Sequence, residues 1–164
     1  MKDTFTQFIR LGFVILALGT VLYWVERTWF APNRVICEQA ELNAAGKGHI
    51  CWQTLMQQYN KDDIIWIDAR SLADYEKNRL AGTKSYPLRP GPQRDELFHR
   101  IEERLFQATD RGECIVVFCT ASCTASDEIA SYLKNEGGLD APIHILSGGW
   151  DTIKTESPTM LLVR

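Results

Sequence analysis

The sequence predicts an α/β fold in which helices flank a parallel β-sheet. Residues 64–67, 115–118 and 143–146 are short runs rich in Ile and Val, typical of strands that are buried on both faces of a sheet. Segments with apolar residues at helical spacing lie between these runs. Because strands that alternate with helices form parallel sheets, with each helix as the crossover, the sequence predicts one sheet covered on both sides.

Composition limits the classes of function. A chain of 164 residues that is 45% hydrophobic buries one core, without room for a second domain of ordinary size. The net charge of −3 shows no basic excess, so no nucleic-acid partner is predicted. Zinc sites need several ligands at short spacing, and only Cys119 and Cys123 form such a pair. We therefore predict neither a metal nor a cofactor.

Residues 5–25 predict a single membrane-spanning helix at the N-terminus. The stretch 11–25 carries no charge, and extension back to residue 5 gives about the 20 residues that a bilayer requires, with Arg10 reaching the interface. A cleaved signal peptide is the competing interpretation, and the small residues of a cleavage site are missing around Ala31. An uncleaved anchor is favoured. Lys2 and Arg10 precede the charge-free run and Arg27 and Arg34 follow it, so the positive charges are nearly balanced; if the first flank dominates, the rest of the chain faces the extracytoplasmic side.

The elements after the anchor follow in order. Residues 31–47 form a connector, in which Cys37 pairs with Cys51 or remains, like it, a buried thiol; two thiols are favoured. A short strand is predicted at 49–52 and a short helix at 53–59. The remaining expected elements are a strand at 64–67, a helix over 94–108 ended by Gly112, a strand at 115–118, a helix over 126–136 and a strand at 143–146.

The most informative stretch surrounds Cys119. This cysteine ends the strand 115–118, and seven small residues, 120–126, lead into the next helix. A helix N-terminus favours negative charge, and the thiolate is the reactive form of cysteine. We therefore predict that Cys119 is a nucleophile whose thiolate is held by loop amides. The candidate binding groups of the loop are Thr120, Ala121, Ser122, Thr124 and Ser126.

These motifs together resemble the rhodanese-like (sulfurtransferase) family, over residues 48–155. The strand at 64–67 leads into Asp68-Ala69-Arg70, which looks like the family's Asp-x-Arg, and Tyr75 follows at the usual place. Residues 79–83 resemble the family's Gly-His-Ile-Pro-Gly-Ala segment, and residues 147–150 look like its Gly-Gly-x-x-x-Trp ending. The predicted organisation is an anchor at 1–30, a connector at 31–47, a rhodanese-like domain at 48–155 and a tail at 156–164.

The resemblance implies an activity and roles for particular residues. It implies a membrane-anchored sulfurtransferase that carries sulfane sulfur as a persulfide on Cys119, taken from a small sulfur-containing donor and passed to a thiol acceptor. Cys123 is expected to resolve the persulfide and leave a disulfide. Arg79 replaces the family's usual His and is expected at the mouth of the site. Four residues are expected to support the site structurally: Asp68, Arg70, Gly148 and Gly149.

The loop departs from the family in one respect that keeps two alternatives open. Family loops commonly carry Arg near the nucleophile, whereas residues 120–126 contain no Arg, Lys or His. The first alternative is a thiol-disulfide redox protein that uses Cys119 and Cys123 without sulfur transfer. The second is a catalytically inactive rhodanese-like binding module. Phosphatase chemistry is excluded because Arg is absent five residues after either cysteine, where Ala125 and Ile129 stand.

Overall fold

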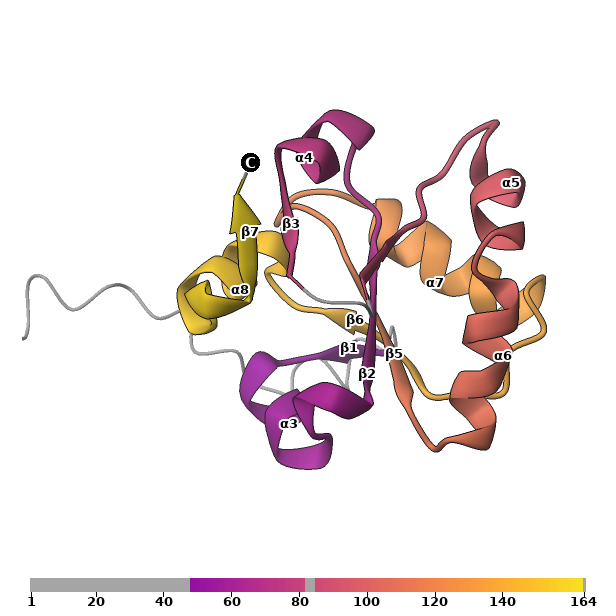
Figure 1. Ribbon diagram of the computed structural model, residues 1–164, viewed down its shortest axis with the longest axis horizontal. Helices are drawn as coiled ribbons and strands as arrows, with labels where there is room; N and C mark the ends of the chain where they lie inside the picture. The colour runs from indigo at the N-terminus through magenta and orange to yellow at the C-terminus, as the bar shows by residue number, and fades with distance from the viewer. Residues whose placement is uncertain (1–47, 82–84, 164) are drawn as a thin grey trace, which may run out of the picture. The chain divides into compact units, whose positions relative to one another are not determined.

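The computed structural model describes residues 48–81 and 85–163 (Figure 1). The elements in chain order are β1 (His49–Ile50), α3 (Trp52–Gln58), η1 (Lys61–Asp63), β2 (Ile64–Asp68), α4 (Leu72–Lys77), β3 (Asn78–Leu80), β4 (Ser85–Pro87), α5 (Arg94–His99), α6 (Glu102–Asp110), β5 (Cys114–Phe118), α7 (Ala125–Asn135), β6 (Ile143–Leu146), α8 (Gly149–Glu156), η2 (Pro158–Met160) and β7 (Leu161–Val163).

Five of the strands form one parallel sheet, as the sequence predicted. Their order is β1-β6-β5-β2-β4, and every neighbouring pair is parallel. β5 lies at the centre, with Val117 opposite Ile67 of β2 on one side and Ile145 of β6 on the other. β3 and β7 pair separately as a small antiparallel ribbon.

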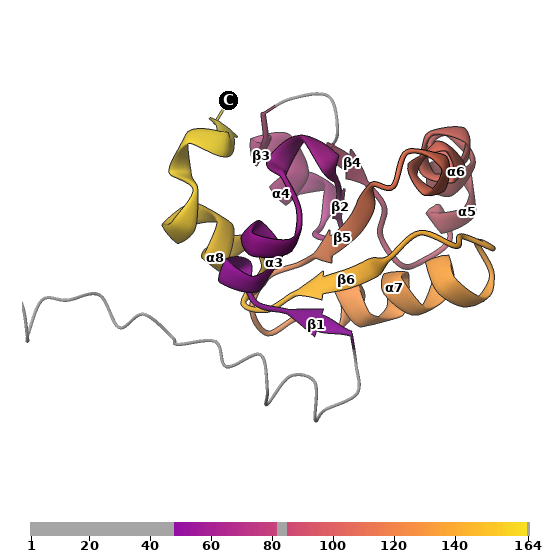
Figure 2. The same ribbon diagram turned by 90° about the horizontal axis from the view of Figure 1, so that it is seen from below.

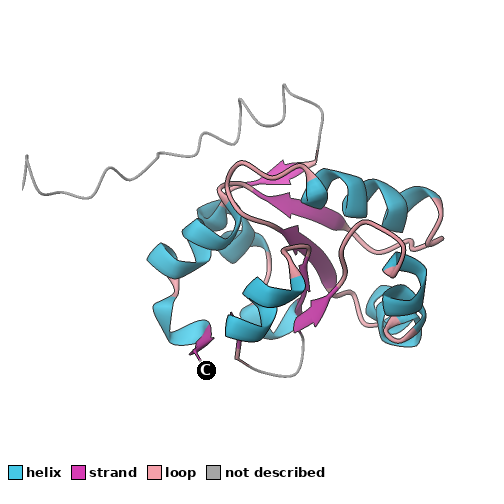
Figure 3. Ribbon diagram, turned by 90° about the horizontal axis from the view of Figure 1, so that it is seen from above, coloured by secondary structure: helices cyan, strands magenta, loops and turns pink. Residues whose placement is uncertain are grey.

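Helices cover both faces of this sheet, which Figures 2 and 3 show from opposite sides. Side chains alternate along a strand, so β2 sends Ile65 and Ile67 to one face and Ile64 and Trp66 to the other. The first face packs against α5, α6 and α7, and the second against α3 and α8. Both faces of β2 and β5 are buried, which is why these strands do not alternate apolar with polar residues in sequence.

The predicted helix over 94–108 is two helices. α5 ends at His99 and α6 starts at Glu102, with Ile101 at φ −123° between them. Ile101 is buried in the core beside Leu105, and β-branched residues favour helices less than Leu or Ala does. The spacing of apolar residues continues across the break, which explains why periodicity alone gave one helix.

Several elements were not predicted from sequence. The C-terminal stretch expected as a tail at 156–164 contains η2 and β7, and β7 pairs with β3. α4 begins at a capped turn, in which the Ser71 hydroxyl accepts a hydrogen bond from the Asp74 amide at 3.2 Å. α8 begins at Gly149, the second glycine of the 147–150 motif, with Gly148 as its N-cap. These elements are three to eight residues long, too short for a clear periodic pattern.

The predicted membrane span at 5–25 and the connector at 31–47 lie outside the described residues. Across 48–81 and 85–163, no helix combines the length and the apolar character that crossing a bilayer demands.

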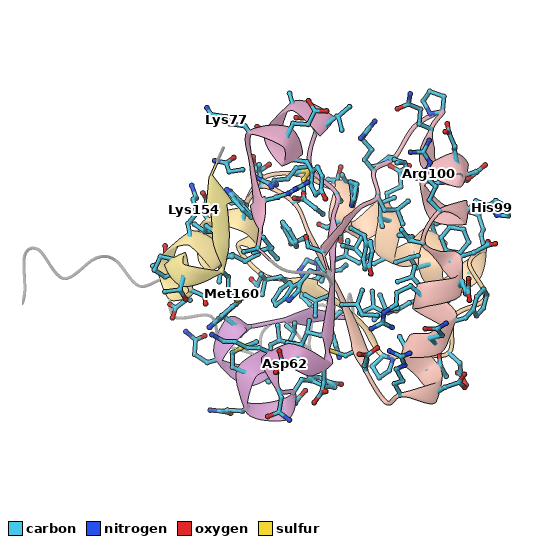
Figure 4. All side chains as sticks on the ribbon, in the orientation of Figure 1. Asp62, Lys77, His99, Arg100, Lys154 and Met160 are labelled. Atoms are coloured by element: carbon cyan, nitrogen blue, oxygen red, sulfur yellow. A yellow bond between two sulfur atoms is a disulfide. The ribbon has the colours of Figure 1, made fainter. Side chains whose placement is uncertain are left out.

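The charged side chains labelled in Figure 4, such as Lys77, Arg100 and Lys154, point away from the packed interior.

Truncation of Leu105 to Ala tests the packing of α6 on the sheet. Leu105 is fully buried, so we expect a loss of about 2–5 kcal/mol in the free energy of unfolding. Phe106 is its neighbour on the same helix and is 47% exposed, so Phe106→Ala is the matched control, with an expected change of about 0.5 kcal/mol. Urea unfolding followed by circular dichroism measures both. Equal losses would contradict the described orientation of α6.

Candidate active site

The candidate site is a cavity of about 150 Å³ beyond the carboxyl ends of β1, β5 and β6. Ligands of open parallel sheets bind at this edge, because the loops that leave the strands converge there. The lining comes from the Cys119 loop, the start of α7, the end of β6 and the following glycine turn. The residues are His49, Cys119, Thr120, Ala121, Cys123, Ser126, Asp127, Ile145, Leu146, Ser147, Gly148 and Gly149.

Cys119 and Cys123 form a disulfide in this cavity. Their Cα atoms are 6.0 Å apart, within the ~4.4–6.8 Å that a disulfide spans. The loop between them folds as a turn, with the Cys123 amide donating a hydrogen bond to the Thr120 carbonyl at 3.1 Å. The small side chains of this loop permit the turn. The turn brings the sulfur atoms of Cys119 and Cys123, four residues apart in sequence, to bonding distance.

The two sulfur atoms lie in different surroundings. Cys119 is 3% exposed, and its Sγ lies 3.9 Å from both the Ala69 carbonyl oxygen and the Thr120 hydroxyl. Cys123 is half-buried, and its Sγ accepts a hydrogen bond from the Ala125 amide at 3.4 Å. The sequence predicted loop amides around Cys119. The structure instead gives an amide partner to Cys123.

Ala125 is the first residue of α7, so its amide belongs to the electropositive end of an 11-residue helix. The N-cap residue, Thr124, makes no side-chain cap bond. The Cys123 sulfur therefore accepts from one of the first-turn N–H groups that have no partner within the helix.

A glycine turn holds the backbone of Cys119 from the opposite side. The Trp150 amide donates a hydrogen bond to the Cys119 carbonyl at 2.7 Å. Gly148 and Gly149 adopt φ +71° and +52°, and a Cβ on Gly149 would lie 2.0 Å from the Cys119 carbonyl oxygen. A side chain at 149 is therefore excluded by contact as well as by conformation.

Asp68 and Arg70 form a buried ion pair at the end of β2. Arg70 Nη2 lies 2.6 Å from Asp68 Oδ2 and 2.7 Å from the Asn78 carbonyl, and both side chains are at most 2% exposed. The guanidinium also stacks 3.6 Å from the centre of the Trp150 ring. The pair thus connects the end of β2 to the residue that holds Cys119, which is a structural role of the kind the sequence implied.

His49 and Asp127 are site residues that the sequence analysis missed. His49 Nε2 lies 3.3 Å from Asp127 Oδ1 across the cavity rim, although the two residues are 78 positions apart. The parallel pairing of β1 with β6 brings His49 to the loop, and that pairing is not visible in the sequence of a two-residue strand. Asp127 carried one weak signal, a carboxylate in the first turn of a helix.

The predicted site residues do not all meet at the cavity. Seven of them line it: Cys119, Cys123, Thr120, Ala121, Ser126, Gly148 and Gly149. Ser122 and Thr124 are exposed on the same loop. Arg79, expected at the mouth, lies on β3 and is not among the lining residues; its guanidinium lies 5.6 Å from the ring of Tyr75 on α4.

The other described cysteines are removed from this chemistry. Cys51 is disulfide-bonded, whereas the sequence analysis favoured a free thiol. Cys114 is a free, fully buried thiol on β5, and burial raises its pKa to about 12. It is therefore a poor nucleophile near neutral pH. Across the described ranges, no group of three or more His, Cys, Asp or Glu side chains is placed to hold a metal.

The sequence model of the rhodanese-like domain matches residues 52–156, which is more than half of the chain. The chain belongs to the rhodanese-like domain family. The match begins at α3 and ends with α8, so it includes the Cys119 loop and the glycine turn. The family indicates a sulfurtransferase or a related function.

Solved structures with low sequence identity resemble the chain. BH2092 protein from Bacillus halodurans has 16% identity and a TM-score of 0.49, over 72% of this chain and 79% of that one. The N-terminal domain of a putative ATP/GTP binding protein from Clostridium difficile 630 has 15% identity and a TM-score of 0.48, over 66% and 97%. Reduced Bacillus anthracis CoADR-RHD has 17% identity and a TM-score of 0.47, over 75% and 19%. No curated protein matches the chain.

Substitution of Gly149 by Ala tests the contact with Cys119. The added Cβ meets a backbone carbonyl, so the turn or the loop has to shift. Gly138→Ala is the matched control, because Gly138 has a similar φ of +63° and open space around it. We expect Gly138→Ala to cost about 1–2 kcal/mol for conformation alone, and Gly149→Ala to cost about 1–3 kcal/mol more. Urea unfolding curves of the two variants provide the comparison, and equal losses would contradict the close approach.

Proposed function

We propose that this chain is a sulfurtransferase that uses Cys119 and Cys123 as a pair, with sulfane sulfur carried on Cys119 and released by Cys123. The disulfide between them is the observation that carries the proposal. A nucleophile that keeps its persulfide until an external acceptor arrives needs one cysteine. A second cysteine within bonding distance supplies an internal acceptor, which distinguishes this site from a single-thiol carrier.

In the loading step, the Cys119 thiolate attacks the outer sulfur of a donor such as a persulfide or thiosulfate. A bond forms between Cys119 Sγ and that sulfur, and the donor's own sulfur–sulfur bond breaks. The donor leaves with the electron pair, as a thiolate or as sulfite, and Cys119 becomes a persulfide. Thr120, Ala121 and Ser126 line the space in which the extra sulfur atom would lie.

In the release step, the Cys123 thiolate attacks Cys119 Sγ. The new bond is the Cys119–Cys123 disulfide, and the terminal sulfur departs as hydrosulfide. Sulfane sulfur gains two electrons, and the two cysteines lose them, so the step balances without another reactant. The Ala125 amide supports this role because it favours Cys123 as the thiolate that attacks.

A thiol-disulfide redox function is the second candidate. The same disulfide favours it, together with the absence of Arg, Lys and His from residues 120–126, because an anionic sulfur donor lacks a cationic partner on the loop itself. In this alternative the pair exchanges electrons with external thiols and never carries sulfur.

Loading of the reduced full chain with thiosulfate or polysulfide separates the two functions. The wild type is expected to release sulfide and form the disulfide. Cys123→Ser is expected to retain one added sulfur atom on Cys119 in intact-mass spectra, because the internal acceptor is gone. Cys119→Ser is expected to do neither. Cys114→Ala is the control, since Cys114 lies outside the cavity, and it is expected to release sulfide at the wild-type rate.

Added sulfur that never appears on Cys119 in the Cys123→Ser variant would overturn the transferase proposal. Retained dithiol oxidation in the wild type would then support the redox candidate.

We also propose that the domain is tethered to a membrane by residues 5–25, on the strength of the charge-free run at 11–25. In cell fractions the full chain is expected in the membrane pellet after an alkaline wash and in the supernatant after detergent. A variant that begins at residue 31 is expected in the soluble fraction. Recovery of the full chain in the wash would contradict the anchor.

A further inference from the structure

We infer that Cys123 is the residue at which an external thiol enters this site, and that the reductant which regenerates the site is a dithiol that passes through a mixed disulfide on Cys123. The inference deepens the proposed function and rests on its use of the Cys119–Cys123 pair. It assigns different tasks to the two sulfurs. Cys119 faces the interior and receives sulfur, whereas Cys123 faces the partner.

Access is the first argument. Thiol-disulfide exchange requires the incoming sulfur to reach one of the two bonded sulfurs, and the rate depends on access to it. Cys119 is 3% exposed and packs in the core cluster on the α7 face of the sheet, with the Ala69 carbonyl beside its Sγ. Cys123 is half-buried, and its side chain only borders that cluster. In the oxidised pair, an external thiolate therefore meets Cys123 first.

The surface around Cys123 fits a large partner. Four neighbouring loop residues, Thr120, Ala121, Ser122 and Thr124, are exposed. All have small side chains, so the loop backbone and the Cys123 sulfur are not screened from a protein that approaches it. Cys123 is thus accessible from the solvent side of the loop, whereas Cys119 is covered by the core cluster.

The Ala125 amide acts in the opposite direction for one step. It donates a hydrogen bond to the Cys123 sulfur and so favours Cys123 as the leaving group when Cys119 is attacked. Attack on Cys119 of the oxidised pair has to reach a sulfur that is 3% exposed and packed in the core cluster. We therefore expect access to decide.

The partner is a dithiol because Cys119 displaces a monothiol that has bonded to Cys123. Once the external sulfur is bound to Cys123, Cys119 is a free thiol on the same short loop, with its Cα 6.0 Å from that of Cys123. Attack within one loop has a high effective concentration, so Cys119 re-forms the disulfide and releases a monothiol. A dithiol escapes this reversal because its own second sulfur attacks the mixed disulfide.

The steps balance as follows. The first partner thiolate forms a bond with Cys123 Sγ, and the Cys119–Cys123 bond breaks with the electron pair on Cys119. The second partner thiolate then attacks the partner sulfur of the mixed disulfide, and Cys123 leaves as the thiolate that the Ala125 amide favours. The partner becomes a disulfide, two electrons pass to the protein, and the two protons of the partner's thiols go to the released sulfurs or to solvent.

The entry residue is tested on the oxidised full chain with reduced glutathione as the probe. Samples are quenched with acid at short times, free thiols are alkylated, and peptides are mapped by mass spectrometry. We expect at least about tenfold more glutathione on Cys123 than on Cys119. A majority on Cys119 would overturn the inference.

Two matched variants remove the transfer of glutathione between the cysteines. Cys119→Ser and Cys123→Ser are each loaded with 5-thio-2-nitrobenzoate on the remaining loop cysteine, and its release by dithiothreitol is followed by absorbance. The adduct on Cys123 is expected to react at least about tenfold faster than the adduct on Cys119. Equal rates would overturn the assignment of access, whatever the effect of either variant on stability.

The dithiol class is tested by comparing dithiothreitol with glutathione at equal thiol concentration on the wild type. We expect dithiothreitol to reduce the pair completely while glutathione leaves most of it oxidised. Equal reduction by glutathione would overturn the assignment of a dithiol. No sulfur donor is present in these experiments, so a failure of sulfur transfer would not affect their outcome.

Discussion

One hydrogen bond, from the Trp150 amide to the Cys119 carbonyl, organises the site. It fixes the first residue of the cysteine loop to the first turn of α8, and it forms only because Gly149 lets two backbones approach without a side chain between them. Trp150 itself packs against the Arg70 guanidinium, 3.6 Å from its ring centre, and against the Phe118 ring, 5.8 Å away. Trp150, which follows β6, thus contacts residues at the ends of β2 and β5. These three strand ends together fix the position of Cys119.

This arrangement explains why a loop without basic residues still forms a structured site. A positive partial charge comes from the helix end, through the Ala125 amide. Among the described lining residues, the ionisable side chains besides the cysteines are His49 and Asp127, which partner each other across the rim. The loop can therefore consist of small residues. The glycine turn holds the backbone of its first residue, and the Cys123 amide bond to the Thr120 carbonyl and the Cys119–Cys123 disulfide close the turn that follows.

The sequence predicted the parts of the fold that depend on local patterns. The buried strands β2, β5 and β6 were confirmed because continuous runs of Ile and Val have few other solutions in a chain of this size. The α5–α6 break at Ile101 was missed because the same apolar residues face the core on both sides of it. Periodicity records which face is buried and does not record whether the helix is continuous.

Prediction of the site divides in the same way, between what local patterns determine and what tertiary pairing determines. Cys119, the small residues after it and the two glycines are adjacent to strand ends, so their positions follow from the predicted elements. The placing of His49 beside Asp127 depends on the pairing of β1 with β6, and the different surroundings of Cys119 and Cys123 depend on which way a four-residue turn folds. Neither property can be read from the spacing of residues in the sequence. The position of Arg79 was inferred from a motif, and the structure places it over Tyr75 instead.

The lengths of the outer strands have a further consequence for the behaviour of the chain in solution. β1 has two residues, and β4 has three and ends in Pro87, which has no amide hydrogen to donate. Long open strands at a sheet border recruit other chains and lead to aggregation. Two apolar segments of the described sheet, IIWID and CIVVF, are instead enclosed as inner strands, so this sheet offers a neighbouring molecule very little open backbone to pair with.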